Sequence, residues 1–176
     1  YFVWSTNTAR HKNHHFALEV LLQYFENGGS LKCVMTGANT DKFDIENEVL
    51  EKDSYIEEIR DIFKSNPILQ ESIIIKGNLP KQRYFKVLSG AKFFLNTSCN
   101  DNGNGTAFDA AMLGVPTLSC DYAAMRNMDR VTSMNMHFYS NNNVDDAVRA
   151  VREMEEKVDF IDMPSREELR KHVVVD

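Results

Sequence analysis

Short apolar runs alternate along the chain with segments in which apolar residues recur at helical spacing. This alternation is typical of βαβ units around a mostly parallel sheet. The apolar runs predict strands at Phe2–Ser5, Leu31–Met35, Ser72–Ile75, Lys92–Asn96, Thr117–Ser119 and Met136–Tyr139. The helical spacing predicts helices at Asn13–Asn27, Glu48–Lys64, Lys81–Leu88, Thr106–Leu113 and Val144–Lys157, with a short helix after Pro164.

Turn residues agree with these boundaries. Gly28-Gly29 ends the first predicted helix, Pro80 stands where a proline would open the third, and Gly114-Val-Pro116 separates the fourth from the next strand. The polar, acidic stretch Ala38–Asn47 predicts a surface loop. The sequence therefore predicts an α/β domain.

Length and composition narrow the class of protein. The 176 residues, with 43% hydrophobic residues and a net charge of −6, predict one globular domain over residues 1–176. No nucleic-acid partner is expected, because phosphate backbones are held by clustered Lys and Arg. Three cysteines, Cys33, Cys99 and Cys120, match neither a disulfide framework nor a zinc site and favour a reducing, cytoplasmic compartment. The chain starts mid-strand without a methionine, so we expect a fragment of a longer protein.

Ligands of such sheets bind beyond the carboxyl ends of the strands, so the loops there are the candidate sites. The first loop, Thr6–Asn13, places Arg10 and Lys12 just before a helix whose free N–H groups suit a diphosphate. A helix capped by Asn13 with solvated charges before it explains the same residues. The histidines at 11, 14 and 15 suggest a metal, but a metal needs further ligands, and we expect none.

The loop after the fourth predicted strand is rich in Asn and Gly. Gly103 and Gly105 let the backbone approach a ligand, and Thr106 offers a hydroxyl and an N–H at the helix start, with Asp109 in the first turn. A phosphate or sugar fits there. A calcium loop is disfavoured because Ala111 stands where a bidentate Glu is required. A polar turn with an Asx cap is the other alternative.

Three stretches resemble the C-terminal domain of the retaining GT-B glycosyltransferases of the group 1, family 4-like class: Thr8–Asn13, Ile73–Leu79 and Phe94–Pro116. The family signature has two glutamates with seven residues between them, the second opening Glu-Ala-Met-Ala-x-Gly-x-Pro. Asp101 and Asp109 have the same spacing, and Ala110–Pro116 matches the tail. The chain departs from the family in having Asp at both positions and Asn7 where the family has Arg.

The resemblance implies a Rossmann-like three-layer sandwich, one half of a GT-B fold. It also implies metal-independent, retaining transfer from a nucleoside-diphosphate sugar, with GDP-mannose as one candidate, in polysaccharide or glycoconjugate synthesis, and no cofactor. The implied catalytic residues are Asp101 toward the sugar, with Lys12 and Arg10 at the diphosphate. The implied donor-binding residues are Asn7, Lys12, Gly37, Lys76, Gly77, Asn78, Gly103, Asn104, Gly105, Thr106 and Asp109, with Asp109 at the ribose and Gly77-Asn78 at the base.

The resemblance further implies partners: an N-terminal acceptor-binding domain of the same polypeptide and peripheral membrane association of the full-length protein. Two alternatives stay open. One is a degenerate domain that binds a nucleotide-sugar without transferring it, which Asp101 in place of Glu favours. The other is an unrelated doubly wound domain such as an epimerase, against which the lack of a Gly-x-Gly-x-x-Gly turn argues.

Overall fold

The computed structural model describes residues 1–49, 53–102 and 105–172. Its centre is one parallel sheet of six strands in the order β3-β2-β1-β4-β5-β6. The strands are β1 (Phe2–Ser5), β2 (Cys33–Thr36), β3 (Ile73–Ile75), β4 (Phe94–Asn96), β5 (Thr117–Cys120) and β6 (His137–Tyr139).

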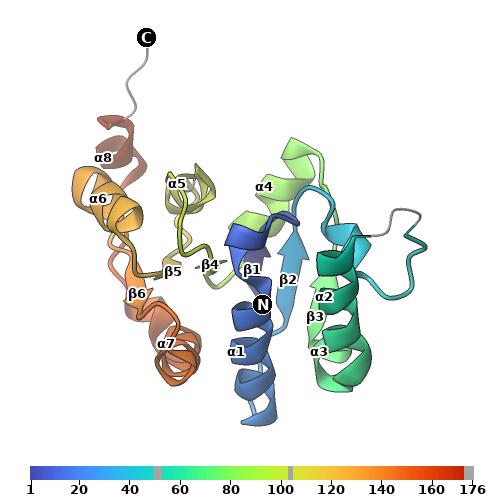
Figure 1. Cartoon of the computed structure of the whole chain (residues 1–176). Coiled ribbons are helices and arrows are strands. Elements are labelled where there is room, and N and C mark those ends of the chain that lie inside the picture. Colours follow the sequence, from blue (N-terminus) through green and yellow to red (C-terminus); the bar gives the residue numbers. More distant parts are fainter. Residues whose placement is uncertain (50–52, 103–104, 173–176) are drawn as a thin grey trace.

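Helices cover both faces of this sheet (Figure 1). One face carries α1 (His14–Glu26), α2 (Ser54–Ser65), α3 (Pro67–Ser72) and α7 (Val144–Lys157). The other carries α4 (Lys81–Ser89), α5 (Gly105–Met112), α6 (Ala123–Thr132) and α8 (Arg166–Arg170). Three short 3-10 helices are η1 (Arg10–Lys12), η2 (Thr40–Phe43) and η3 (Val158–Phe160). The predicted α/β class and Rossmann-like three-layer sandwich are confirmed.

Covering both faces explains why the strands read as apolar runs. Every residue of β2, β4 and β5 is buried, because parallel strands between two helical layers have no solvent-facing side. The cores of the two faces differ in composition. The α1 face packs large aromatic side chains around Trp4, whereas the α5 face packs the small side chains Ala107, Ala110 and Ala111. Small residues bring the axis of α5 close to the sheet.

Glycine ends two helices as the sequence predicted. Gly28 has a φ of 86°, and its N–H and that of Gly29 bond the carbonyls of Phe25 and Tyr24. Gly114, with a φ of 75°, closes α5 in the same way. This pairing satisfies carbonyls that the last turn of a helix leaves open, in a conformation that glycine adopts without strain.

The structure corrects several predicted boundaries. α3 and α6 were not predicted, because a six-residue helix is too short to show a period and half of the residues of α6 are polar. α2 starts at Ser54, not Glu48, because the Asp53 carboxylate accepts the Tyr55 N–H and caps it. Pro80 is the N-cap of α4 and not its first residue.

The stretch Ala38–Asn47 is not only a surface loop. It contains η2, in which Thr40 and Phe43 are fully buried. The Phe43 ring packs edge-on against His14 of α1, with ring centroids 4.9 Å apart. Phe43 is surrounded by polar residues in the sequence, so the pattern did not predict that its side chain packs into the core.

The strand order defines where a ligand would bind. The chain runs outward from β1 through β2 to β3, then returns to the other side of β1 and continues through β4 to β6. In sheets of this kind the order reverses between β1 and β4, and the loops that leave these two strands diverge around a crevice. The loops Thr6–Asn13 and Thr97–Thr106 both start there.

Candidate functional site

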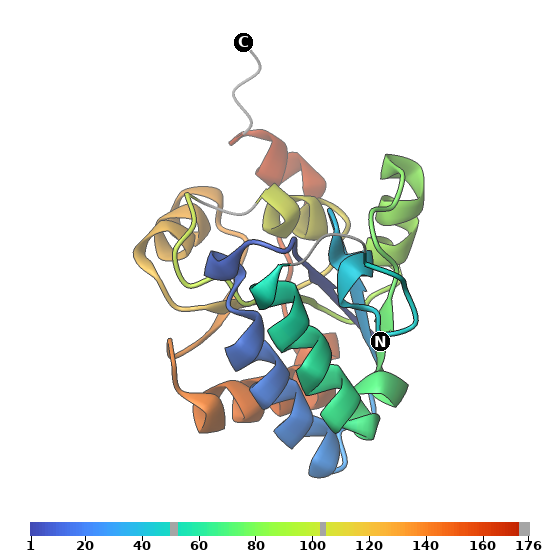
Figure 2. The same cartoon turned by 45° about the vertical axis from the view of Figure 1, so that its right-hand side comes forward.

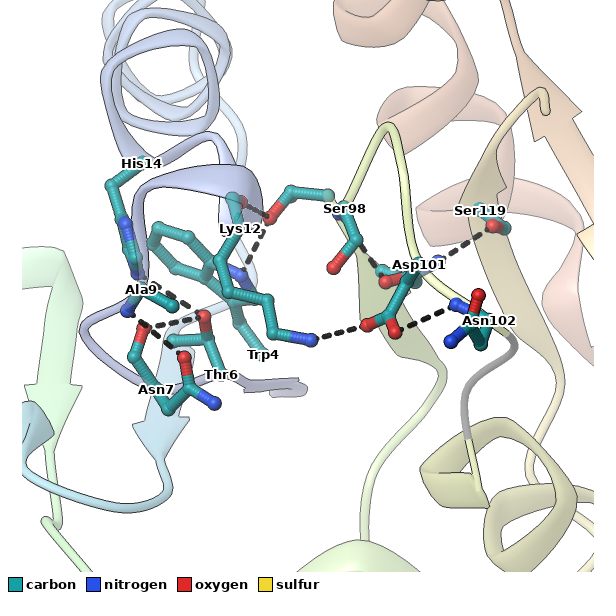
Figure 3. A network of polar contacts seen from close by, with 12 residues as sticks. Trp4, Thr6, Asn7, Ala9, Lys12, His14, Ser98, Asp101, Asn102 and Ser119 are labelled. Carbon is teal, nitrogen blue, oxygen red and sulfur yellow. Dashed lines mark hydrogen bonds and ion pairs between the residues drawn. The ribbon is translucent and has the colours of Figure 1, made fainter. Parts of the chain in front are cut away.

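A lysine and an aspartate face each other from the loops that follow β1 and β4 (Figure 3). Lys12 Nζ donates to Asp101 Oδ2 at 2.5 Å, and their side chains are only 16% and 24% exposed. Burial by itself would raise the pKa of Asp101. The hydrogen bond and positive charge of Lys12 outweigh that effect and hold the pKa below its usual value. The pair therefore presents a cation and a carboxylate side by side in a partly desolvated place.

The backbone of Lys12 is held by two buried side chains. Thr97, directly after β4, donates its hydroxyl to the Lys12 carbonyl at 2.8 Å. Trp4 of β1 donates its indole N–H to the same hydroxyl oxygen at 3.0 Å. Because this chain of hydrogen bonds links both strands to η1, the position of Lys12 depends on the sheet and not on a free loop (Figure 3).

His14, the first residue of α1, bonds to the same loop through its imidazole ring. It is fully buried, its Nε2 lies 3.1 Å from Thr6 Oγ1, and its Nδ1 lies 2.8 Å from the Tyr55 hydroxyl. The Thr6 hydroxyl donates to the Asn7 carbonyl, so we assign the Nε2 proton of His14 to the bond with Thr6. Burial lowers the pKa of His14 to about 4. The ring is therefore neutral at pH 7 and serves as a structural bridge.

The neighbouring loops after β2 and β3 meet the first loop through glycines. Gly77 offers one carbonyl to both the Thr36 hydroxyl, at 2.8 Å, and the Gly37 N–H, at 2.9 Å. At Gly37, with a φ of 133°, an added Cβ would stand 1.7 Å from the Thr6 carbonyl oxygen. Only glycine allows this approach, which brings the three loops together at the carboxyl edge.

The other side of the crevice is the start of α5. The structure places Asp109 in the second turn, since α5 begins at Gly105, so its predicted place in the first turn is wrong. Burial raises the pKa of Asp109 and the nearby charge of Lys81 opposes the rise. The hydroxyl of Tyr84, from the inner face of α4, lies near Ser5, Thr106 and Asp109.

Buried polar atoms of Asn13, Tyr84 and Tyr122 lie near this site. Asn13 Nδ2 completes no hydrogen bond within the described residues, whereas the Tyr84 hydroxyl interacts with Ser5 and Thr106 and the Tyr122 hydroxyl with Asn96. Asn13 precedes α1, Tyr122 follows β5, and Tyr84 lies against the end of β1 and the start of α5. All three therefore lie around the carboxyl edge of the sheet. A buried polar group without a partner costs about 1–3 kcal/mol, and native proteins tolerate such groups where water, an ion or a ligand supplies the partner.

The remaining predicted site residues fall into three groups. Arg10 is exposed and stacks on Tyr55 of α2, with its guanidinium carbon 4.6 Å from the ring centre, so it points away from Asp101. Asn7 turns its side-chain oxygen to the Ala9 N–H and shapes the loop. The exposed residues Lys76 and Asn78 flank buried Gly77.

The loop before α5 is described only in part. Gly105 and Thr106 begin the first turn of α5, and this turn has no acidic side chain. The predicted donor-binding residues Gly103 and Asn104 lie outside the described residues. Across the described ranges, no group of three or more His, Cys, Asp and Glu side chains could hold a metal ion.

Sequence reasoning missed several of the residues that build this site. Trp4 and Thr97 position Lys12, while Asn13, Tyr84 and Tyr122 place buried polar atoms around the carboxyl edge. A signal existed only for Tyr84, which shares the inner face of α4 with buried Leu88 at i+4 spacing. Tyr122 lies in the loop between β5 and α6, and this loop was not predicted as a binding site because it contains neither a glycine nor a cation.

Comparison with known proteins gives a fold but no sequence family. No model of a protein family matches the sequence, and no curated protein matches it. Among solved structures, the chain is similar to Anabaena HepE in complex with UDP-glucose, with a TM-score of 0.71, 10% identity and 97% of this chain covered. It is likewise similar to the lipopolysaccharide outer core galactosyltransferase WaaB, with a TM-score of 0.69, 16% identity and 99% covered.

A third similar structure is the pneumococcal O-GlcNAc transferase GtfA in complex with UDP and GlcNAc, with a TM-score of 0.64, 13% identity and 97% of this chain covered. The chain spans only 43%, 45% and 34% of the lengths of the HepE, WaaB and GtfA chains, respectively. It thus has the fold of a Rossmann-like domain of GT-B glycosyltransferases. In the described part of the chain, every helix is too short or too polar to cross a membrane.

Proposed function

We propose that this chain is the donor-binding domain of a glycosyltransferase that uses a nucleoside-diphosphate sugar. The observation that carries the proposal is the Lys12–Asp101 pair, which lies at the reversal of strand order where such sheets bind nucleotides. The fold shared with glycosyltransferases, two of them holding UDP or UDP-glucose, supports it.

The proposed donor lies across the crevice with its diphosphate at Lys12. The first N–H groups of α1 and the amide of Asn13 add donors there, with no acidic side chain in the first turn to repel an anion. The sugar then lies at Asp101, the ribose at Asp109, and the base at the backbone of Gly77.

The chemistry of the proposed reaction is the departure of the nucleoside diphosphate. Negative charge builds on the phosphate oxygens as the glycosidic bond breaks, and a fixed cation with oriented N–H groups stabilises that charge. Lys12 supplies the cation without a metal. Asp101 orients the sugar hydroxyls and, once Lys12 binds phosphate, is released from its ion pair. Retention of anomeric configuration is the stereochemical course that we propose.

The acceptor is proposed to bind on an N-terminal domain of the same polypeptide. The chain spans less than half of the similar glycosyltransferases, which leaves room for such a domain in the complete protein. Residues 1–176 alone should then bind donor without sustained transfer, because catalysis needs donor and acceptor held together. Sustained sugar transfer by this chain alone would contradict the two-domain proposal.

The test of donor binding is calorimetry of the chain against UDP, GDP and ADP and their glucose or mannose conjugates. We expect one base to be preferred, with a ligand-dependent rise in melting temperature, because a ligand that binds only the native state stabilises it. Binding of nucleosides as tightly as nucleoside diphosphates would contradict a phosphate site at Lys12.

A binding domain without transferase activity is the second candidate. Asp101, one methylene shorter than the glutamate of the family signature, favours it. Adding the missing methylene by Asp101→Glu in the complete protein separates the two. An active enzyme should lose turnover, whereas a degenerate one has none to lose.

Peripheral association with an anionic membrane is also part of the proposal, and the charge distribution supports it. Between Glu71 and Asp101 the chain has no acidic residue but five basic ones: Lys76, Lys81, Arg83, Lys86 and Lys92. Arg83 and Lys86 are exposed residues of α4. This helix is the light green one at the right-hand edge of Figure 2. Cosedimentation with anionic vesicles that Arg83→Gln and Lys86→Gln weaken together would support this surface. Equal binding to neutral vesicles would exclude an electrostatic contact.

A further inference from the structure

Strand β3 forms one edge of the sheet, and part of its backbone has no partner strand there. The Lys76 N–H bonds the Met35 carbonyl of β2. Successive residues of a strand point their N–H and C=O groups to opposite sides, so Ile75 directs both of its groups outward. Beyond the ladder with β2, no backbone hydrogen bond between described residues reaches Ile75. Edge strands of this kind are templates for pairing with a further strand.

A pocket of about 270 Å³ lies beside this edge. Its apolar lining comes from β3, α2 and the stretch that follows β2, and consists of Ile73, Ile75, Phe63, Phe43 and Ile45. The volume lies just below the range of pockets for drug-sized ligands, about 300–1,000 Å³, and suits a single large side chain.

One wall of the pocket is fixed by Arg60 of α2. Its guanidinium donates to the carbonyls of Lys42, Ile45 and Asn47 at 3.0, 3.2 and 3.1 Å, and also to that of Asp44. Because these hydrogen bonds hold residues 42–47 in place, the wall is formed before any ligand arrives. Binding then costs little ordering of the site.

The surface around the pocket is acidic. Residues 41–61 contain nine acidic and three basic residues, a net charge of −6 that equals the net charge of the whole chain. Asp44 and Glu46 line the pocket itself, while the positive charge of Arg60 is turned to the backbone. A basic partner is therefore attracted to this edge and an acidic one is repelled.

The opposite edge strand, β6, differs on each count (Figure 1). Its pocket is only about 80 Å³ and is lined by charges of both signs, Glu153 and Lys157. The guanidinium carbon of Arg126 lies 3.9 Å from the centre of the Phe138 ring and covers that side chain. An unpaired backbone, an apolar pocket and charge of one sign thus coincide at β3.

We propose that the edge of β3 binds an extended peptide segment of a partner protein that carries apolar and basic residues. The peptide adds as a strand and pairs its backbone with Ile75. It places one large apolar side chain in the pocket and its basic side chains against Asp44 and Glu46. Backbone pairing supplies affinity, and the pocket and the charges supply specificity. β2 and β1 lie between this edge and the donor crevice, so peptide binding does not depend on the proposed function.

The probe is the fluorescein-labelled heptapeptide Lys-Val-Lys-Phe-Lys-Val-Lys, followed by fluorescence anisotropy at low salt. The wild-type chain should bind it, whereas the same peptide with Glu in place of every Lys should not bind. N-methylation of the lysine amides and N-methylation of the valine and phenylalanine amides block opposite edges of the extended peptide. One of the two should weaken binding about tenfold or more, and the other should leave it nearly unchanged.

The pocket and the charges are tested separately. Replacing the central Phe of the peptide with Ala leaves the protein unaltered and should weaken binding about tenfold or more, because the buried ring is lost. Asp44→Asn combined with Glu46→Gln should weaken binding about fivefold, the range of two partly exposed ion pairs. The matched control is Glu153→Gln combined with Glu156→Gln, which removes the same charge from exposed positions of α7, a helix that packs beside β6. The control should leave the affinity nearly unchanged.

Several results would overturn the proposal. Equal effects of the two methylations would show that no strand is added, and unchanged binding of the Ala peptide would show that the pocket is not used. Equal losses in the Asp44 and Glu46 variant and in its control would reduce the contact to net charge. A wild-type dimer in analytical ultracentrifugation that the peptide dissociates would make a second copy of the chain the occupant of this edge. Failure of the wild-type chain to bind the heptapeptide at millimolar concentration would exclude the site, whatever the same chain does with nucleotides.

Discussion

Replacing Asp101 with asparagine removes the charge that pairs with Lys12 while keeping the size of the side chain. In the proposed site this carboxylate competes with phosphate for the same ammonium group. Asp101→Asn should therefore strengthen the binding of a nucleoside diphosphate, whereas Lys12→Ala should weaken it. A gain in affinity from removing a charged site residue is the distinctive outcome, because simple damage to the site would weaken binding in both variants.

The expected magnitudes follow from the exposure of the pair. At 2.5 Å and with side chains 16% and 24% exposed, the pair is neither fully solvated nor buried. Taking about 1 kcal/mol for such a pair, the upper end for exposed ones, gives about a fivefold gain for Asp101→Asn. A hydrogen bond from Lys12 to a charged phosphate is worth about 1.5–3 kcal/mol, so Lys12→Ala should cost about tenfold or more.

The pH dependence has a definite sign. Lys12 depresses the folded pKa of Asp101, so the stabilisation from the pair is present above the unfolded pKa and is lost as pH falls through the folded pKa. At pH 7 the wild-type carboxylate is therefore charged and competes fully. The gain of Asp101→Asn over wild type should shrink as the assay approaches that acidic range, where the wild-type side chain becomes neutral too.

Calorimetry at pH 7 with the nucleoside and its diphosphate is the assay. Lys12→Ala should leave the nucleoside affinity nearly unchanged. Asp61→Asn is the control, since Asp61 forms a similar ion pair with Lys64 at 2.7 Å on α2, but with both side chains more than half exposed. Weaker diphosphate binding by Asp101→Asn, or equal loss of nucleoside and diphosphate by Lys12→Ala, would refute the competition and the phosphate site respectively.

Three further predictions concern stability and ribose binding. Gly37→Ala should destabilise the fold by about 3 kcal/mol or more in urea unfolding, because its Cβ would stand 1.7 Å from the Thr6 carbonyl oxygen. Gly28→Ala, also at positive φ but with no atom within 4 Å, should cost only about 1 kcal/mol; equal losses would remove the clash as the cause. The folded pKa of His14, about 4, lies below the unfolded value, so the contribution of neutral His14 to stability is present above pH 6.5 and is lost as pH falls toward 4. His14→Gln should therefore flatten the dependence of the unfolding free energy on pH in this range. An unchanged slope would contradict the burial of His14 in its neutral form. Asp109→Asn should lower nucleoside-diphosphate affinity about tenfold with little change in melting temperature. A 2′,3′-dideoxy nucleotide should bind the wild type and the variant alike. Loss of stability with unchanged affinity would show that Asp109 stabilises α5 and does not contact the ribose.

Local patterns in the sequence were sufficient for most of the secondary structure. The bounds of β1 and α7 are as predicted, and the other strands lie within two residues of their predicted starts. Chain reversals were equally readable, because Gly28 and Gly114 adopt a conformation that few other residues reach without strain. Patterns failed where they were short or misleading, as at α3 and at Phe43, a single apolar anchor in a polar stretch.

The sequence by itself determined the α/β class and the set of loops at the carboxyl ends of the strands, because alternation and helical period are properties of neighbouring residues. It could not decide which loops meet. Lys12 and Asp101 are 89 positions apart, and they pair because β4 returns to lie beside β1. Tertiary structure alone also decided that His14 is buried and neutral and that Arg10 turns toward Tyr55. Each depends on strand order and on packing between distant elements, which the spacing of residues along the chain does not encode.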